Sequence, residues 1–180
     1  SSDLTMQQIS RMDRAQQVSR KSTVTVHVSH PMYGAIRGTG TYAKFGRDLV
    51  VVTAAHVLGP PMPPDVSANE PLALQVRTAA GTYFPAQLAY EDRENDIAVF
   101  KLDNNLPDMA PVNLRVSGPF GVNIGDPVVY TGSPSHHDRL TIYGRLAGNA
   151  QNGDLILHSY AWSGASGSGI FDQRGRLIGV

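Results

Sequence analysis

A histidine, a carboxylate and a serine in this chain could together carry out nucleophilic chemistry. The stretch VVVTAAHVLG places His56 just beyond a run of β-branched residues. An imidazole can accept and release a proton near neutral pH, a carboxylate can orient it, and a serine hydroxyl needs such a base to attack a carbonyl. The carboxylate candidates are Asp96, which opens the apolar stretch DIAVFKL, and its neighbours Glu91, Asp92 and Glu94.

The serine candidate is Ser166, within the stretch SGASGSGIFD at residues 163–172. Gly164 and Gly167 bracket Ser166, and glycine permits a tight turn that presents the hydroxyl. Backbone N–H groups that converge in such a turn can stabilise an oxyanion, and we expect those of Gly164 and Ser166 to do so. A flexible linker is the alternative, but linkers rarely run directly into apolar segments such as IFD and LIGV.

The elements that must position these residues are one helix and many short strands. Residues 1–22 predict an amphipathic helix, capped by Ser2 or Asp3, whose apolar side carries Leu4, Ile9, Met12 and Val18. Apolar and β-branched runs separated by turn residues predict strands at 22–29, 37–45, 48–55, 72–81, 83–90, 96–102, 126–134, 139–148, 154–160, 168–175 and 176–180. The proline-rich segment 104–114 predicts a connector. This pattern favours an all-β sandwich or closed barrels.

Composition excludes several classes of protein. The 180 residues include 15 basic and 15 acidic side chains and no run of like charge, so no nucleic-acid or membrane partner is predicted. The absence of cysteine excludes disulfides, thiolate metal sites and a cysteine nucleophile. His136 and His137 have no third ligand at a suitable spacing, so no metal site is expected. No membrane span or signal peptide is recognisable, which is compatible with the cytoplasm, the periplasm or a viral polyprotein.

The blocks TAAH, DIAVFKL and GASGSGIF, in this order, resemble the three catalytic blocks of trypsin-like (chymotrypsin-fold) serine proteases. The resemblance covers residues 23–180, and the lack of cysteine makes the chain similar to HtrA-like bacterial proteases or viral polyprotein-processing proteases. Asp96 directly precedes IAVF, where the family places its acid. The implied architecture is two six-stranded antiparallel β-barrels. The helix at 1–22 precedes a first barrel at 23–104, which carries the histidine and aspartate, and a second at 105–180, which carries the serine.

The resemblance implies a serine endopeptidase that acts on protein or peptide substrates through His56, Asp96, Ser166 and an acyl-enzyme, without a cofactor. Its role would be polyprotein processing or protein quality control. Two positions depart from the family pattern: Ser168 replaces the second glycine of G-x-S-G-G, and Gly169 replaces a proline. The alternative is a catalytically silent binding or scaffold module with a protease fold. A third interpretation is a latent protease activated by a partner or by oligomerisation through the N-terminal helix, although we expect this helix to pack on its own barrel.

The resemblance also indicates where the substrate pocket lies. Tyr160, six positions before the serine, occupies the base of the pocket, and Ala161 and His158 are expected beside it. Because no carboxylate stands there to compensate a desolvated cation, we expect poor cleavage after lysine or arginine. The strand that begins RLIGV would continue past Val180 to form the pocket wall. We therefore expect the chain to be part of a longer polypeptide, with an incomplete second barrel, and to turn over substrate poorly alone.

Overall fold

A computed structural model describes residues 6–61, 73–114, 123–132, 140–149, 155–158 and 166–180 of the chain. One helix, α1 (Met6–Ser22), precedes the strands. The strands of the first sheet are β1 (Thr23–His30), β2 (Gly34–Phe45), β3 (Asp48–Thr53), β4 (Ala73–Arg77), β5 (Tyr83–Asp92), β6 (Ile97–Leu102) and β7 (Val112–Asn113), and the 3-10 helix η1 (Ala55–Leu58) follows β3. Those of the second are β8 (Pro127–Gly132), β9 (Leu140–Asn149), β10 (Leu155–His158), β11 (Ile170–Asp172) and β12 (Leu177–Gly179).

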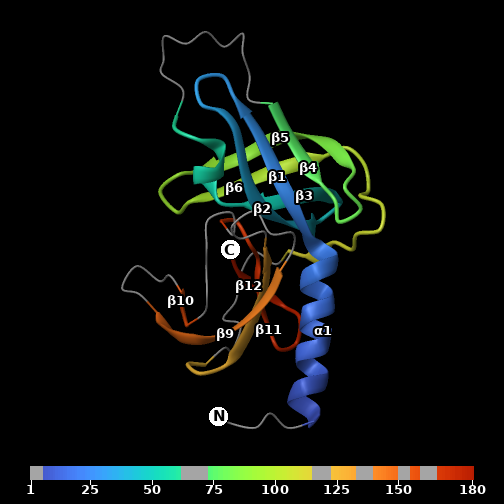
Figure 1. The fold of residues 1–180 in the computed structure, drawn as a ribbon, viewed down its shortest axis with the longest axis vertical. Coiled ribbons are helices and arrows are strands. Elements are labelled where there is room, and N and C mark those ends of the chain that lie inside the picture. Colours follow the sequence, from blue (N-terminus) through green and yellow to red (C-terminus); the bar gives the residue numbers. More distant parts are fainter. Residues whose placement is uncertain (1–5, 62–72, 115–122, 133–139, 150–154, 159–165) are drawn as a thin grey trace.

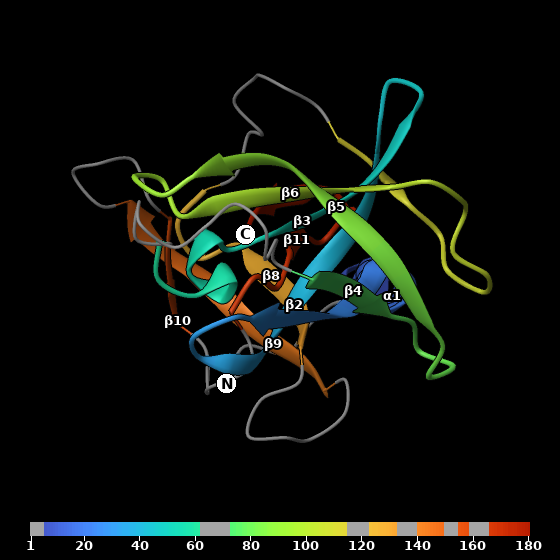
Figure 2. The ribbon, with the colours of Figure 1, turned by 90° about the horizontal axis from the view of Figure 1, so that it is seen from above.

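The first sheet closes into a six-stranded antiparallel barrel. Its strand order is β1-β4-β5-β6-β3-β2, and β1 also pairs with β2, which closes the ring (Figure 2). The short strand β7 pairs in parallel with the end of β2, at Ala43 and Lys44. This strand lies within the segment predicted as a connector, and its two residues are too few for a periodic pattern to reveal it.

Alternating side chains fill the interior of this barrel. Val24, Val26 and Val28 of β1 are buried in the main hydrophobic cluster, as the period of two along a strand requires. Tyr42 and Phe100 are the largest side chains of that cluster. Burial of branched and aromatic side chains on the inner face stabilises the barrel without any disulfide.

The second sheet has five strands in the order β10-β9-β8-β11-β12 and is not closed within the part of the chain described. The fold is therefore all-β with one N-terminal helix and one closed six-stranded barrel, as expected. The predicted second six-stranded barrel is not shown, because the described part of the second sheet has five strands and is open.

Helix α1 packs mainly on the second sheet (Figure 1), whereas we expected it to pack on the barrel that follows it. Ala15 is fully buried in a small cluster with Val129 of β8 and Phe171 of β11. Ser19, on the same face of the helix, hydrogen-bonds the hydroxyl of Thr131 at 2.7 Å. The helix thus joins the two units, since its last residue leads directly into β1. Neither this helix nor any other in the described segments is long and apolar enough to cross a membrane.

Candidate active site

His56 lies on η1, the short turn that directly follows the buried strand β3. Three of its four residues, Ala55, Val57 and Leu58, are buried in the barrel, whereas His56 is exposed. Because the three apolar side chains anchor the turn, the remaining side chain must point outward from the barrel rim. A hydrogen bond of 3.1 Å from the N–H of Gly59 to the carbonyl of His56 closes the turn.

Asp96 is the last residue of the turn between β5 and β6. Its φ of 56° lies in the left-handed region, which aspartate adopts more readily than most non-glycine residues. Strand β6 pairs with β3, with Ala98 opposite Thr53, and this register places Asp96 beside the turn that carries His56.

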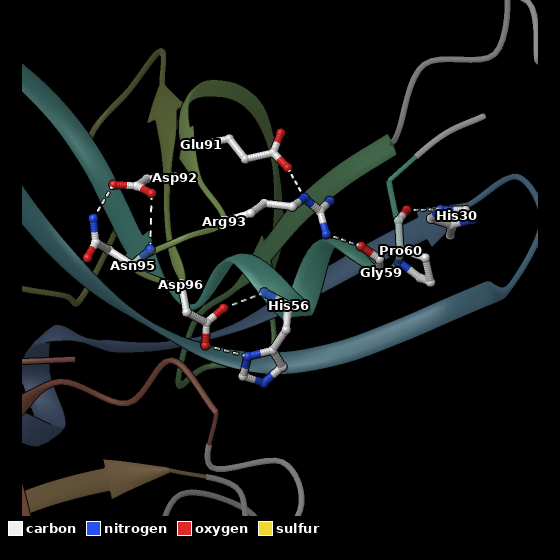
Figure 3. Close-up of polar contacts among 9 residues, drawn as sticks. All are labelled: His30, His56, Gly59, Pro60, Glu91, Asp92, Arg93, Asn95 and Asp96. Atoms are coloured by element: carbon white, nitrogen blue, oxygen red, sulfur yellow. Dashed lines mark hydrogen bonds and ion pairs between the residues drawn. The ribbon is translucent and has the colours of Figure 1, made fainter. Parts of the chain in front are cut away.

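The carboxylate of Asp96 contacts His56 at two points (Figure 3). Its Oδ2 lies 2.7 Å from the imidazole Nδ1, and its Oδ1 accepts a 2.8 Å hydrogen bond from the backbone N–H of His56. A carboxylate accepts a hydrogen bond from a protonated Nδ1, so in the neutral ring Nε2 carries the lone pair. The side chains are 58% and 49% exposed, so solvent screens their attraction, and orientation of the ring is the main effect of the contact.

The other three carboxylate candidates have different surroundings. Glu91 forms an ion pair with Arg93. Asp92 accepts hydrogen bonds from the side-chain and backbone nitrogens of Asn95, and these bonds lower the pKa of Asp92. Glu94 is exposed. Asp96 is therefore the carboxylate that the described structure brings to the imidazole.

Ser166 lies against the barrel through backbone contacts. Its carbonyl accepts a 2.9 Å hydrogen bond from the N–H of Thr39 on β2. Gly167 has a φ of +89°, and a Cβ there would meet the Thr39 carbonyl, the Thr53 hydroxyl and, at 3.1 Å, the backbone nitrogen of Ala54. Since Ala54 is two residues before His56, the serine loop reaches the start of the turn that carries the imidazole.

Ser168 and Gly169, which follow Gly167, are also closely packed. Ser168 is buried, so the serine that replaces a family glycine fits the packed loop. A Cβ on Gly169 would meet the hydroxyl of Thr41 and, at 3.2 Å, the ring of Phe171. This lack of space explains why glycine stands at position 169.

The remaining predicted site residues are not placed in detail. Gly164, Tyr160 and Ala161 lie outside the described residues, as do His136 and His137. His158 is the last residue of β10, and its backbone alone is described. Within the described segments, no group of three histidine, aspartate or glutamate side chains could hold a metal ion.

Sequence reasoning did not identify Thr39, Thr53 or Arg93 as part of this region. Thr53 donates a 2.7 Å hydrogen bond to the Thr39 carbonyl, which holds β3 and β2 together where the serine loop contacts them. Arg93 donates to the carbonyl of Gly59, just after the histidine turn. These contacts join distant segments largely through backbone atoms, so no residue pattern indicates them.

The sequence matches the family model of the trypsin-like peptidase domain over residues 38–180. This match spans most of the chain, which therefore belongs to the trypsin-like peptidase domain family. No curated protein matches the sequence.

The fold is similar to solved HtrA-type and related proteases. A serine endoprotease from Yersinia pestis is 21% identical, with a TM-score of 0.71 over 100% of this chain and 58% of that chain. The HtrA-type protease AlgW, solved with a tripeptide, is 19% identical, with a TM-score of 0.71 over 94% of this chain and 53% of that chain. The chain thus spans little more than half the length of these neighbours, and at such identities the likeness shows the fold alone.

Proposed function

We propose that this chain is the catalytic domain of a serine endopeptidase whose triad is His56, Asp96 and Ser166. The observation that carries the proposal is the two-point contact between Asp96 and His56, with Oδ2 2.7 Å from Nδ1. Membership of the trypsin-like peptidase family supports a protease, and the docking of the Ser166 loop beside Ala54 supports the serine as nucleophile.

The proposed reaction is acyl transfer to water. His56 takes the hydroxyl proton of Ser166 at Nε2 as the serine oxygen attacks a peptide carbonyl. Asp96 holds the Nδ1 proton and stabilises the imidazolium. The N–H groups of Gly164 and Ser166 stabilise the oxyanion, and His56 then protonates the leaving amine. Water, activated by the same imidazole, releases the acyl group from the serine.

The orientation of the imidazole is the step on which this chemistry depends. Without a partner, a neutral histidine exchanges its proton between the two ring nitrogens and rotates freely. Asp96 accepts one hydrogen bond from the ring and one from the backbone of the same residue, so both the tautomer and the ring direction are restricted. The resulting lone pair on Nε2 is what a serine hydroxyl requires of a base.

A fluorophosphonate probe tests the proposal, because it reacts covalently with an activated serine. We expect the wild-type chain to label at one site, and Ser166→Ala to lose labelling with an unchanged melting temperature. Ser168→Gly is the matched control, since it alters a serine two positions away and restores the family residue, and it should still label. Labelling of Ser166→Ala, or no labelling of a folded wild-type chain, would contradict the proposal, and the latter would favour the silent scaffold. The biological role, in polyprotein processing or protein quality control, stays a prediction.

A further inference from the structure

Arg93 links the turn that carries His56 to the turn that carries Asp96. Its Nη1 donates a 2.6 Å hydrogen bond to the carbonyl of Gly59, the C-cap residue of η1 (Figure 3). Arg93 itself stands three residues before Asp96 in the turn between β5 and β6. We propose that Arg93 is a positioning residue that holds these two turns together and so sets the geometry of the His56–Asp96 pair. This inference rests on the proposed function.

The conformation of Gly59 is restricted by its surroundings. Its N–H already bonds the carbonyl of His56, and its φ of +79° is one that side-chain-bearing residues rarely adopt. A Cβ at this position would meet the side chains of Ile36 and His30 at 2.7 and 2.8 Å, so Gly59 is closely packed against both. A hydrogen bond to the Gly59 carbonyl is therefore transmitted to the histidine turn.

Pro60, the residue after Gly59, is held by the side chain of His30. The carbonyl of Pro60 lies 3.1 Å from Nε2 of His30, and Nδ1 of His30 accepts the N–H groups of Met32 and Tyr33. His30 thus fixes the segment to the end of β1. The bond from Arg93 couples the same segment to the turn that ends in Asp96.

Glu91 orients Arg93 for this task. Its Oε1 pairs with Nε of Arg93, while Nη1 is directed at Gly59. Both side chains are about one-third exposed, at 32% and 33%, so solvent screening makes the ion pair a weak contributor to stability. A guanidinium serves both partners because its donors diverge in a rigid plane, whereas a lysine ammonium cannot reproduce that fork.

The expected consequence is a loss of alignment without unfolding. When Arg93 is removed, the aspartate turn loses its contact with Gly59, and the carboxylate shifts relative to the imidazole. A displacement near 1 Å in such a constellation lowers rates by up to roughly 100-fold. We expect Arg93→Ala to slow fluorophosphonate labelling about 10- to 100-fold, and to lower kcat for a peptide substrate while KM stays constant. Arg93→Lys should behave like Arg93→Ala, and added guanidinium ion at low concentration should partly restore the labelling rate of Arg93→Ala.

Arg47→Ala is the matched control, since Arg47 is an exposed arginine in the turn between β2 and β3 of the same barrel. It should label like the wild type. Wild-type labelling rates in Arg93→Ala, or equal slowing in Arg47→Ala, would overturn the inference.

A second readout does not depend on catalysis. The proton between Nδ1 of His56 and the Asp96 carboxylate should give a downfield proton NMR signal in the wild type, which shifts or broadens in Arg93→Ala and stays in Arg47→Ala. An unchanged signal in Arg93→Ala would overturn the positioning role, even in a chain that does not label. A wild-type chain that shows the NMR signal but does not react with the probe would contradict the proposed function. In that case, the comparison of the NMR signal between the wild type and Arg93→Ala still tests the positioning role of Arg93. If Arg93→Ala does not fold, Glu91→Ala, which removes the hydrogen-bond acceptor of Arg93 Nε, should cause the same change to a smaller degree, and no change there would count against the inference.

Discussion

The backbone carbonyl of Ser166 accepts a 2.9 Å hydrogen bond from the N–H of Thr39, so the serine loop is attached to strand β2 of the barrel that carries His56. The two residues are far apart in the chain, and the contact involves no side chain. The position of the serine hydroxyl therefore depends on how closely this loop approaches β2. The next residue, Gly167, permits this close approach because it has no side chain.

We expect Gly167→Ala to displace the serine loop and abolish labelling at Ser166. A methyl group at position 167 would overlap the Thr39 carbonyl and the Thr53 hydroxyl, in addition to the strain at a φ of +89°. Gly125→Ala is the matched control, because Gly125 has a φ of +91° but no described atom within 4 Å of the place that the methyl group would occupy. It should cost about 1–2 kcal/mol in unfolding free energy and still label. Equal labelling of both variants in a probe assay would contradict this prediction.

Asp96→Asn should lower kcat/KM for peptide hydrolysis by roughly 10³- to 10⁴-fold. Asparagine fits the same left-handed backbone, but it offers one acceptor where Asp96 accepts from both the backbone N–H and Nδ1 of His56. An amide group that faces Nδ1 would favour the tautomer with the proton on Nε2. Asp92→Asn, at the end of β5 just before this turn, should have nearly wild-type kinetics. A loss below tenfold in Asp96→Asn would argue against a role for Asp96 in catalysis.

Stability should fall on acidification partly because of His27. Burial, together with the charges of Arg37 and Arg77, lowers the pKa of His27 below the usual value near 6.5. The folded state therefore binds this proton less well than the unfolded state. The stabilising contribution is complete above the unfolded pKa and is lost as the pH falls from there toward the folded pKa. Urea unfolding at about pH 8 and about pH 5, on either side of the ordinary histidine pKa, should show a smaller loss for His27→Gln than for the wild type, and equal losses would refute the assignment.

Ala15→Leu should destabilise the contact between α1 and the second sheet. Ala15 is fully buried against Val129 and Phe171, and extra methylene groups in a packed site typically cost about 1–3 kcal/mol. Gln17→Leu places the same side chain on the exposed side of the helix and should leave the melting temperature nearly unchanged. Thermal denaturation compares the two, and an equal effect would mean that α1 does not depend on this contact.

Cleavage after lysine or arginine should be poor. The resemblance places Tyr160 at the base of the pocket, and an uncharged base leaves a buried cation without a partner. A peptide-library profile should show low cleavage after basic residues in the wild type and a gain in Tyr160→Asp. Efficient cleavage after arginine by the wild type would show that Tyr160 is not at the pocket base.

The sequence alone indicated the all-β class, the N-terminal helix and the three residues of the proposed triad. Strands such as Thr23–His30 are recognisable because apolar and polar side chains alternate along the sequence with a period of two. His56 and Ser166 were recognisable because each lies beside an apolar run, in an order that resembles a known family. These are local signals, and they can be interpreted without knowing which strands pair.

The tertiary structure decided which groups meet. Among the four carboxylates between 91 and 96, only the resemblance to a family singled out Asp96, whereas the folded chain directs Glu91 to Arg93, Asp92 to Asn95 and Asp96 to His56. Likewise, the placement of α1 on the second sheet, the pairing of β1 with β4 in the barrel, and the attachment of Ser166 to Thr39 join segments far apart in the chain. Such contacts depend on strand register and on backbone atoms that every residue shares, so no pattern of side chains specifies them in advance.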